Sequence, residues 1–211
     1  ANPNIIADVE KVFDCLKHSH KRYSYEHLLV SPYDMRSAIN TMLNTEIEQA
    51  QKGKQAYFYG KFNSLTDEEI IQQMYKASQA GVTIRLIIRG SCCLKPHIEG
   101  LSEHIEIHSI VDSYLEHARM IIHANGGNEK SYILSADLMA RNLDRRVEVA
   151  VPILDKAIHQ TLCDIFRLQW HDNVKARLLT DTKENSYYRG KGREKIRSQN
   201  DLYDYFLTKN N

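Results

Sequence analysis

A histidine and two arginines stand where apolar runs begin or end, in positions suited to binding phosphate. His117 precedes the run 118–124 (ARMIIHA), Arg119 lies at its start, and strand alternation places both on one face. Arg89 lies at the end of the run 82–90 (VTIRLIIRG), where a loop begins. Because ligands of open α/β sheets bind beyond the carboxyl ends of strands, an arginine there can hold phosphate through its planar fork. This set predicts the binding or transfer of phosphate.

Further polar side chains follow two other predicted strands. Lys61 lies near the end of the run 55–62 (QAYFYGKF), and Arg141 and Asn142 lie in a polar turn after the run 130–135 (KSYILS). Each follows a strand, so each is a candidate for contacting phosphate oxygens.

Two more features could add to such a site. Ser135 and Asp137 could hydrogen-bond across it from the turn that carries Arg141. The stretch 187–197 (YYRGKGREKIR) has five basic residues against one glutamate, a local charge of +4 suited to a polyanion.

Each of these residues also has a structural interpretation, and the residues alone leave both open. His117 could be a half-buried histidine paired with Glu116 or with a backbone carbonyl. Arg89 could be a solvated arginine at a strand end, and Lys61 a surface lysine. The turn around Arg141 and the basic stretch after it could be ordinary solvated charges.

The composition is that of an ordinary globular chain. Hydrophobic residues make up 42% and charged residues 26%, and the net charge of +1 predicts no strongly charged partner. The chain lacks a P-loop pattern, a dinucleotide fingerprint and an apolar run of the ~20 residues that span a bilayer. Its four cysteines form no CxxC pattern, which favours reduced thiols in a cytosolic protein. Five histidines without metal-ligand spacing to cysteines predict no metal site: His18, His20, His97, His104 and His108.

Apolar periodicity predicts one compact α/β domain. Helices are expected over 4–17, 35–53, 64–81, 155–171 and 194–208, with β-rich runs between them. Thr66 and Glu69 are spaced as a capping box, and 136–144 is predicted as a polar turn. Early strands alternate with helices and later strands are separated by short turns, which favours a mixed sheet between helices.

Several segments, in order, resemble the last domain of polyphosphate kinase, of the long type related to phospholipase D. They are KFNSLTD (61–67), LIIRGSCCL (86–94), GLSEHIEIHSIVDSYLEHARM (100–120), NGG (125–127), SADLMARNLDRRVEVAVPILD (135–155), VKARLL (174–179) and YYRGKGREKIRSQNDLYDY (187–205). The resemblance implies a phospholipase-D-like mixed β-sheet flanked by helices. It implies a helical lead-in over 1–20, the catalytic domain over 21–182, and a basic segment with a C-terminal helix over 183–211.

The resemblance also implies an enzyme that reversibly moves the terminal phosphate of ATP onto inorganic polyphosphate, with Mg²⁺ and a phosphohistidine intermediate. Such enzymes build the active centre from two similar halves, each with a histidine. The segment EHAR (116–119) matches the second half. The resemblance therefore gives His117 and Arg89 catalytic and nucleotide-binding roles. The weaker candidates for contacting phosphate are Lys61, Arg119, Arg141 and Asn142.

The histidine that is phosphorylated belongs to the first half, which this sequence does not contain. We therefore expect a piece of a longer protein, inactive alone, with the Mg²⁺ ligands outside it. The partners implied are ATP or ADP, polyphosphate and the remainder of the polypeptide, without nucleic acid. A cytoplasmic homo-oligomer is expected, and peripheral association with a membrane stays open.

The sequence departs from the family pattern at two positions, and two other functions stay open. Ser113 stands where the family usually has arginine, and His97 where it usually has glycine, which affects substrate affinity more than the reaction. A module that binds nucleotide or polyphosphate without catalysis stays open. So does a phosphodiesterase of the phospholipase D kind, although that class favours lysine and asparagine where this chain has Arg119 and Asp137.

Overall fold

A mixed eight-stranded sheet organises the chain, as the sequence predicted. The computed structural model describes residues 2–18, 20–180, 185–190 and 194–209. The strand order is β1-β7-β6-β5-β2-β3-β4-β8, in which β2, β3 and β4 run parallel and the other neighbours pair antiparallel. The strands are β1 (Leu29–Ser31), β2 (Tyr57–Phe62), β3 (Thr83–Ile88), β4 (Ile105–Ile110), β5 (Met120–His123), β6 (Lys130–Leu134), β7 (Glu148–Pro152) and β8 (Ala176–Leu178).

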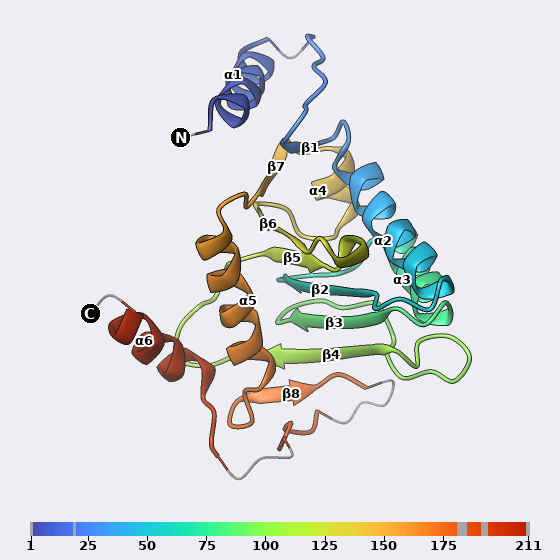
Figure 1. The fold of residues 1–211 in the computed structure, drawn as a ribbon, viewed down its shortest axis with the longest axis vertical. Coiled ribbons are helices and arrows are strands. Elements are labelled where there is room, and N and C mark those ends of the chain that lie inside the picture. Colours follow the sequence, from blue (N-terminus) through green and yellow to red (C-terminus); the bar gives the residue numbers. More distant parts are fainter. Residues whose placement is uncertain (1, 19, 181–184, 191–193, 210–211) are drawn as a thin grey trace.

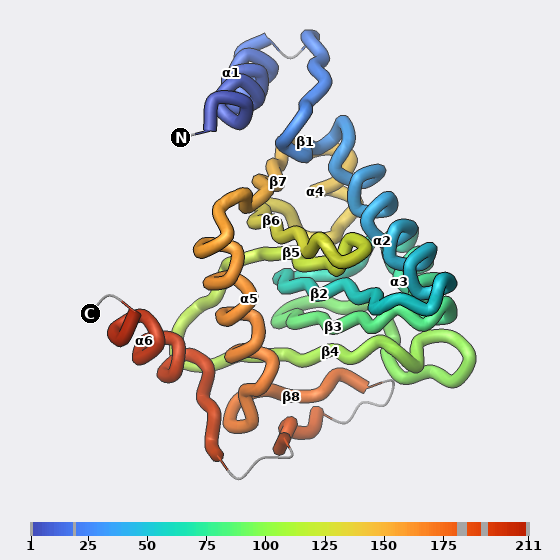
Figure 2. The backbone as a smooth tube through the Cα atoms, viewed as in Figure 1, coloured from blue at the N-terminus to red at the C-terminus, as the bar shows by residue number. Residues whose placement is uncertain are grey.

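Helices cover both faces of this sheet (Figure 1). Those described are α1 (Pro3–Lys17), α2 (Met35–Gln51), α3 (Glu68–Gln79), α4 (Ala140–Asp144), α5 (Lys156–Trp170) and α6 (Ser198–Lys209), with a 3₁₀ turn η1 at Asn125–Gly127. The main core lies between the sheet and the pair α2 and α3, while a second core lies between the sheet and α5. Figure 2 shows α6 beside α5, and α1 beyond the β1 end of the sheet.

Alternation along the central strands divides their side chains between the two cores. Phe58 and Phe62 of β2 face α2 and α3, while Tyr59 stacks on Phe166 of α5 with ring centroids 5.4 Å apart. In β5, Ile121 faces the first core and Met120 the second. The predicted alternation therefore holds within β5, although His117 and Arg119 lie just before its first residue rather than inside it.

Three boundary predictions were wrong. Helix α3 is capped by Asp67, whose carboxylate accepts the Ile70 N–H at 3.1 Å, so Thr66 and Glu69 do not form the capping box. The predicted turn contains the short helix α4, and the last helix begins at Ser198 rather than at 194. Apolar periodicity specifies neither the exact end of a helix nor a helix as short as α4.

Hydrogen bonds join three loops at the carboxyl ends of β2 and β3. Leu65 forms isolated parallel bridges with Cys92 on one side and Leu138 on the other. The Gly90 N–H donates to the Asn63 carbonyl at 2.8 Å. These backbone bonds hold the loops after β2, β3 and β6 in one layer, which can position side chains for a ligand. None of the described helices is long and apolar enough to cross a membrane.

The close contact at Gly90 predicts that its replacement disturbs this layer. A Cβ at Gly90 would lie 2.7 Å from the Asn63 carbonyl oxygen, a backbone atom that cannot rotate away. We expect Gly90→Ala to lower the free energy of unfolding by about 1–3 kcal/mol in urea titrations. The exposed neighbouring substitution Ser91→Ala should change it by less than about 0.5 kcal/mol. Equal stability of Gly90→Ala and wild type would contradict the contact.

Candidate phosphate site

The imidazole of His117 lies directly against the guanidinium of Arg119. Its two ring nitrogens are 3.2 Å and 3.1 Å from Nη1 and Nη2 of Arg119, and Nη1 also donates to the His117 carbonyl at 3.0 Å. His117 is exposed, whereas the Arg119 side chain is only 10% exposed. The nearly buried guanidinium of Arg119 therefore supports the ring of His117, which faces solvent.

A carboxylate from the next segment holds Arg119 in place. Asp137 accepts Nε at 3.1 Å and Nη2 at 3.0 Å, one bond to each carboxylate oxygen. It also accepts the Asn63 backbone N–H at 2.7 Å and is itself buried. Burial acts to raise the pKa of Asp137, but hydrogen bonds from Arg119 and Asn63 outweigh it and hold the pKa below its usual range. Asp137 is therefore ionised at neutral pH.

Asn63 extends this network to Arg89. Its side-chain amide nitrogen donates to Asp137 at 3.2 Å, and its side-chain oxygen accepts Nε of Arg89. The contacts therefore run continuously from Arg89 through Asn63, Asp137 and Arg119 to His117. No described residue accepts a hydrogen bond from the two terminal nitrogens of Arg89. They are the pair that can grip two phosphate oxygens.

The fold explains why these residues meet. Arg89 and Asn63 follow the carboxyl ends of the parallel strands β3 and β2. Strand β5 runs antiparallel to β2, with Met120 opposite Lys61, so the residues before β5 arrive at the same edge. The three segments thus converge at the edge where ligands of open α/β sheets bind.

Lys61 faces α5 and is already paired. It is buried, forms an ion pair with Glu116 and donates to Gln169 Oε1 at 3.0 Å. Burial lowers the pKa of Lys61, and the carboxylate of Glu116 opposes that shift. Lys61 is therefore not the surface lysine that the sequence left open. Glu116 pairs with Lys61 rather than with His117, so the alternative pairing of His117 with Glu116 is also wrong. A phosphate contact by Lys61 would first have to break this ion pair.

Arg141 and Asn142 differ sharply although they are adjacent. Arg141 is exposed on α4, and no described residue pairs with its guanidinium. Asn142 is buried and donates its amide nitrogen to Glu148 at 2.6 Å, while Ser135 donates to the same carboxylate. Asn142 and Ser135 therefore connect the turn to β7. Ser135 and Asp137 were both expected to hydrogen-bond across the site, and only Asp137 does so.

The basic stretch is only partly described, because Lys191 and Arg193 lie outside the described residues. Arg197 donates to Asp112 at 2.8 Å and 2.7 Å and to the Ser113 hydroxyl at 2.9 Å. Arg189 lies over the ring of Tyr187, 5.1 Å from its centroid. Arg197 therefore holds the start of α6 against the segment before His117. Ser113, which departs from the resembled pattern, takes part in that contact.

The sequence alone does not reveal the contacts of two residues, one in this network and one beside it. Asn63 is the link between Arg89 and Asp137, a role that its place after β2 does not by itself reveal. Glu116 was a predicted partner for His117, yet its carboxylate accepts hydrogen bonds from Lys61, from Gln169 and, at 3.0 Å, from Gln199. The available signal was position, since both residues border strand ends where polar side chains gather.

The chain has a phospholipase-D-like fold, with arginine and histidine side chains gathered where β2 and β3 end. A phospholipase D family member from Salmonella typhimurium, Nuc, superposes with a TM-score of 0.53 at 14% identity, over 73% of this chain and 97% of its own. That likeness shows the fold alone. A polyphosphate kinase structure from Porphyromonas gingivalis superposes with a TM-score of 0.95 at 39% identity, over 99% of this chain and 32% of its own.

Sequence comparison names the family. The family model "Polyphosphate kinase C-terminal domain 2" matches residues 28–199. Polyphosphate kinases of Vibrio cholerae and Escherichia coli K12 are 43% and 40% identical over 205 residues, which are 97% of this chain and 29% and 30% of theirs. The chain belongs to the polyphosphate kinase family, as the resemblance predicted, and spans about 30% of the length of these relatives.

Loss of the Asp137 charge should destabilise the fold in a pH-dependent way. We expect Asp137→Asn to lower the free energy of unfolding at pH 7 by about 3 kcal/mol, because Arg119 loses its buried partner. The depressed pKa means that this contribution is complete above about pH 4 and is lost as pH falls through the folded-state pKa. Urea titrations between pH 7 and pH 2.5 should show the two proteins converging. A stability gap that stays constant would contradict the ion pair.

The buried pair of Lys61 and Glu116 gives a separate stability prediction. Lys61→Met should lower the free energy of unfolding by about 3 kcal/mol because it leaves Glu116 with an uncompensated charge. Adding Glu116→Gln should recover at least 1 kcal/mol of that loss. A double variant less stable than Lys61→Met alone would contradict the pairing.

Proposed function

We propose that this chain supplies the second half of an active centre that reversibly transfers the terminal phosphate of ATP to inorganic polyphosphate. One observation supports the proposal most directly: Arg89 and His117 belong to one contact network, in which the terminal nitrogens of Arg89 have no partner among the described residues and the ring of His117 is exposed. Phosphoryl transfer depends mainly on positioning and on neutralising charge at the equatorial oxygens. A rigid cationic edge meets that need.

Each residue has a distinct part in this proposal. Arg89 grips phosphate oxygens through its two terminal nitrogens, anchored by the bond from its Nε to Asn63. Arg119 orients the His117 ring and adds positive charge, since Asp137 holds its guanidinium in place. His117, which is exposed, would turn one ring nitrogen away from Arg119 and donate from it a hydrogen bond to the nucleotide or a proton to a leaving oxygen.

The nucleophile of this proposal lies outside the chain. The phosphohistidine would form on the histidine of the other half, so that both halves are needed for turnover. Arg141, exposed on α4, is proposed as an outer contact for polyphosphate. Lys61 and Asn142 support the site through Glu116 and Glu148 instead of touching phosphate.

Magnesium fits the phosphates better than it fits these residues. Bound Mg²⁺ would neutralise phosphate charge, but both oxygens of Asp137 already accept hydrogen bonds from Arg119 and Asn63. The carboxylate within the network is therefore not free to coordinate a cation. We propose that Mg²⁺ is held by ATP or ADP and by residues beyond this chain.

The wider setting follows from the family. We propose that the chain works with the remainder of a longer polypeptide, as a homo-oligomer in the cytoplasm, on ATP and polyphosphate rather than on nucleic acid. Peripheral association with a membrane is compatible with this setting. These proposals rest on the relatives named above, of which this chain covers about 30%.

The decisive substitutions remove the two ligand-facing side chains. In the full-length polypeptide, His117→Ala and Arg89→Ala should each lower ATP-dependent polyphosphate synthesis at least 100-fold, because each removes stabilisation of the transferred phosphate. Arg89→Lys should recover little, since an ammonium cannot make two parallel hydrogen bonds. The measurement is incorporation of labelled phosphate into polyphosphate.

Matched controls separate catalysis from folding. The exposed residues His104 and Arg22 lie outside the network, so His104→Ala and Arg22→Ala should keep synthesis within twofold of wild type. All variants should unfold within a few degrees of each other. Near-normal synthesis by His117→Ala or Arg89→Ala would refute the proposal. If the wild-type full-length protein binds nucleotide but makes no polyphosphate, the result would favour a binding module.

A further inference from the structure

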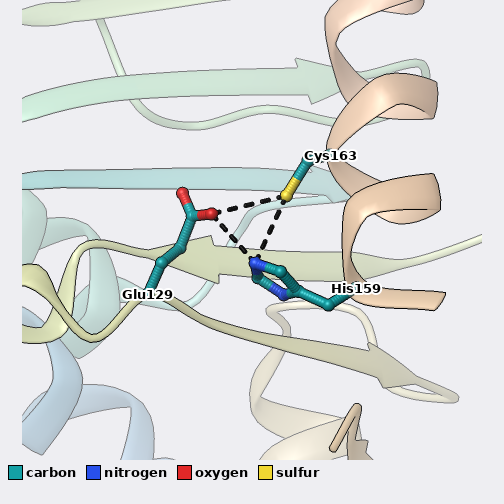
Figure 3. A group of neighbouring side chains, drawn as sticks. All are labelled: Glu129, His159 and Cys163. Atoms are coloured by element: carbon teal, nitrogen blue, oxygen red, sulfur yellow. Dashed lines mark hydrogen bonds and ion pairs between the residues drawn. The ribbon is translucent and has the colours of Figure 1, made fainter. Parts of the chain in front are cut away.

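A second cluster of reactive side chains lies at the opposite edge of the sheet. Glu129 precedes β6, and His159 and Cys163 lie one helical turn apart on α5 (Figure 3). One donor atom from each residue lies within 4.8 Å of the other two. Tyr57, at the amino end of β2, donates to Glu129, which places the cluster far along the strand from Asn63 and the phosphate site.

We propose that Glu129, His159 and Cys163 form a binding site for a zinc-class divalent cation. The three donors are carboxylate Oε1, imidazole Nε2 and thiol Sγ, which is a donor set that zinc uses and that magnesium does not. His159 and Cys163 are four residues apart, so both project from the same face of α5. Three protein donors leave one position of a tetrahedron open.

The distances between the three donor atoms are close to those of tetrahedral zinc coordination. Sγ lies 3.5 Å from Oε1 and 3.7 Å from Nε2, and Nε2 lies 2.9 Å from Oε1. Donors around tetrahedral zinc are about 3.3–3.6 Å apart, given bonds of about 2.0–2.3 Å. A circle through the three atoms has a radius of about 2.0 Å, so a cation near its centre would reach all three. Only the nitrogen–oxygen pair must widen by a few tenths of an ångström.

Neighbouring side chains already orient two of the donors. The Nδ1 of His159 is 2.7 Å from the buried Ser131 hydroxyl, which leaves Nε2 to face the cluster. Tyr57 takes the other oxygen of Glu129, Oε2, which leaves Oε1 facing His159 and Cys163. Such outer hydrogen bonds fix ring tautomers and carboxylate orientation in metal sites.

The cation would replace protons that now hold the cluster together. Burial and the Glu129 carboxylate raise the pKa of the Cys163 thiol to about 12, so the metal-free thiol is protonated. Zinc binding forms the sulfur–zinc bond and releases the thiol proton to water. Glu129 and Cys163 also line a cavity of about 300 Å³ with Tyr57 and Arg167, through which water or a small ligand can reach the open position.

The direct test measures metal binding rather than activity. The purified protein is freed of metal with a chelator and dialysed against Zn²⁺, and in parallel against Co²⁺, which reports thiolate ligation by a charge-transfer band in the near-ultraviolet. Wild type should take up one cation per chain with that band, and millimolar Mg²⁺ should not displace it. Zn²⁺ should also raise the unfolding temperature.

Variants assign the site. Cys163→Ser should abolish the cobalt–thiolate band, and Cys163→Ser and His159→Ala should each weaken zinc binding at least 100-fold. Ser131→Ala should weaken it about tenfold, as expected for a group that orients a ligand. Cys93→Ser and His104→Ala, both exposed and outside the cluster, should bind as wild type does.

Two results would overturn the proposal. One is zinc uptake that is equal in wild type, Cys163→Ser and His159→Ala. The other is a cobalt complex of wild type without a thiolate band. Unfolding temperatures of the metal-free variants check that each is folded. Because no step of this test uses ATP or polyphosphate, its outcome is independent of the function proposed above.

Discussion

The ion pair between Arg119 and Asp137 is the interaction on which the candidate phosphate site depends. Each side chain is only 10% exposed, so each charge needs the other in order to remain buried. Asp137 also accepts hydrogen bonds from the backbone and side-chain N–H groups of Asn63, and the side-chain oxygen of Asn63 accepts one from Arg89. One carboxylate thus fixes residues that follow β2, β3 and β6 and that precede β5. Both oxygens of this carboxylate accept hydrogen bonds inside the network.

Helix α5 connects this site to the rest of the domain. Near its carboxyl end Gln169 contacts Lys61 and Glu116, beneath the segment that leads to His117. His159 lies in its first turn and Cys163 at its middle, at the proposed zinc site. The stacked rings of Phe166 and Trp170 pack the carboxyl-terminal half of the helix onto the sheet. The two sites therefore share one rigid element while using opposite edges of the sheet.

Much of the fold was predictable because it rests on periodic burial. The mixed sheet, the helices on its two faces and the alternation within β5 all follow from apolar spacing along the chain. Positions at strand ends also located Arg89 and His117 at one edge. The cap at Asp67 was missed because it depends on one local hydrogen bond, and the helix α4 because its five residues are too few to show a helical period.

Side-chain partners were the part that sequence could not supply. Lys61 and Glu116 are 55 residues apart, and their pairing follows only from the register of β2 against β5 and from the packing of α5. The cluster of Glu129 with His159 escaped notice because its members come from a loop and a helix that periodicity does not bring together. The family resemblance gave the reaction class but not these contacts.

The central claim is that Arg89 and His117 act within one site, although 28 positions separate them in the sequence. A double-mutant cycle on ATP-dependent phosphate transfer tests it in the full-length polypeptide, with Arg89→Ala and His117→Ala made singly and together. The account predicts strong coupling, with the double variant at least tenfold more active than the product of the two single effects. Losses that simply multiply, as for two independent positions, would contradict it.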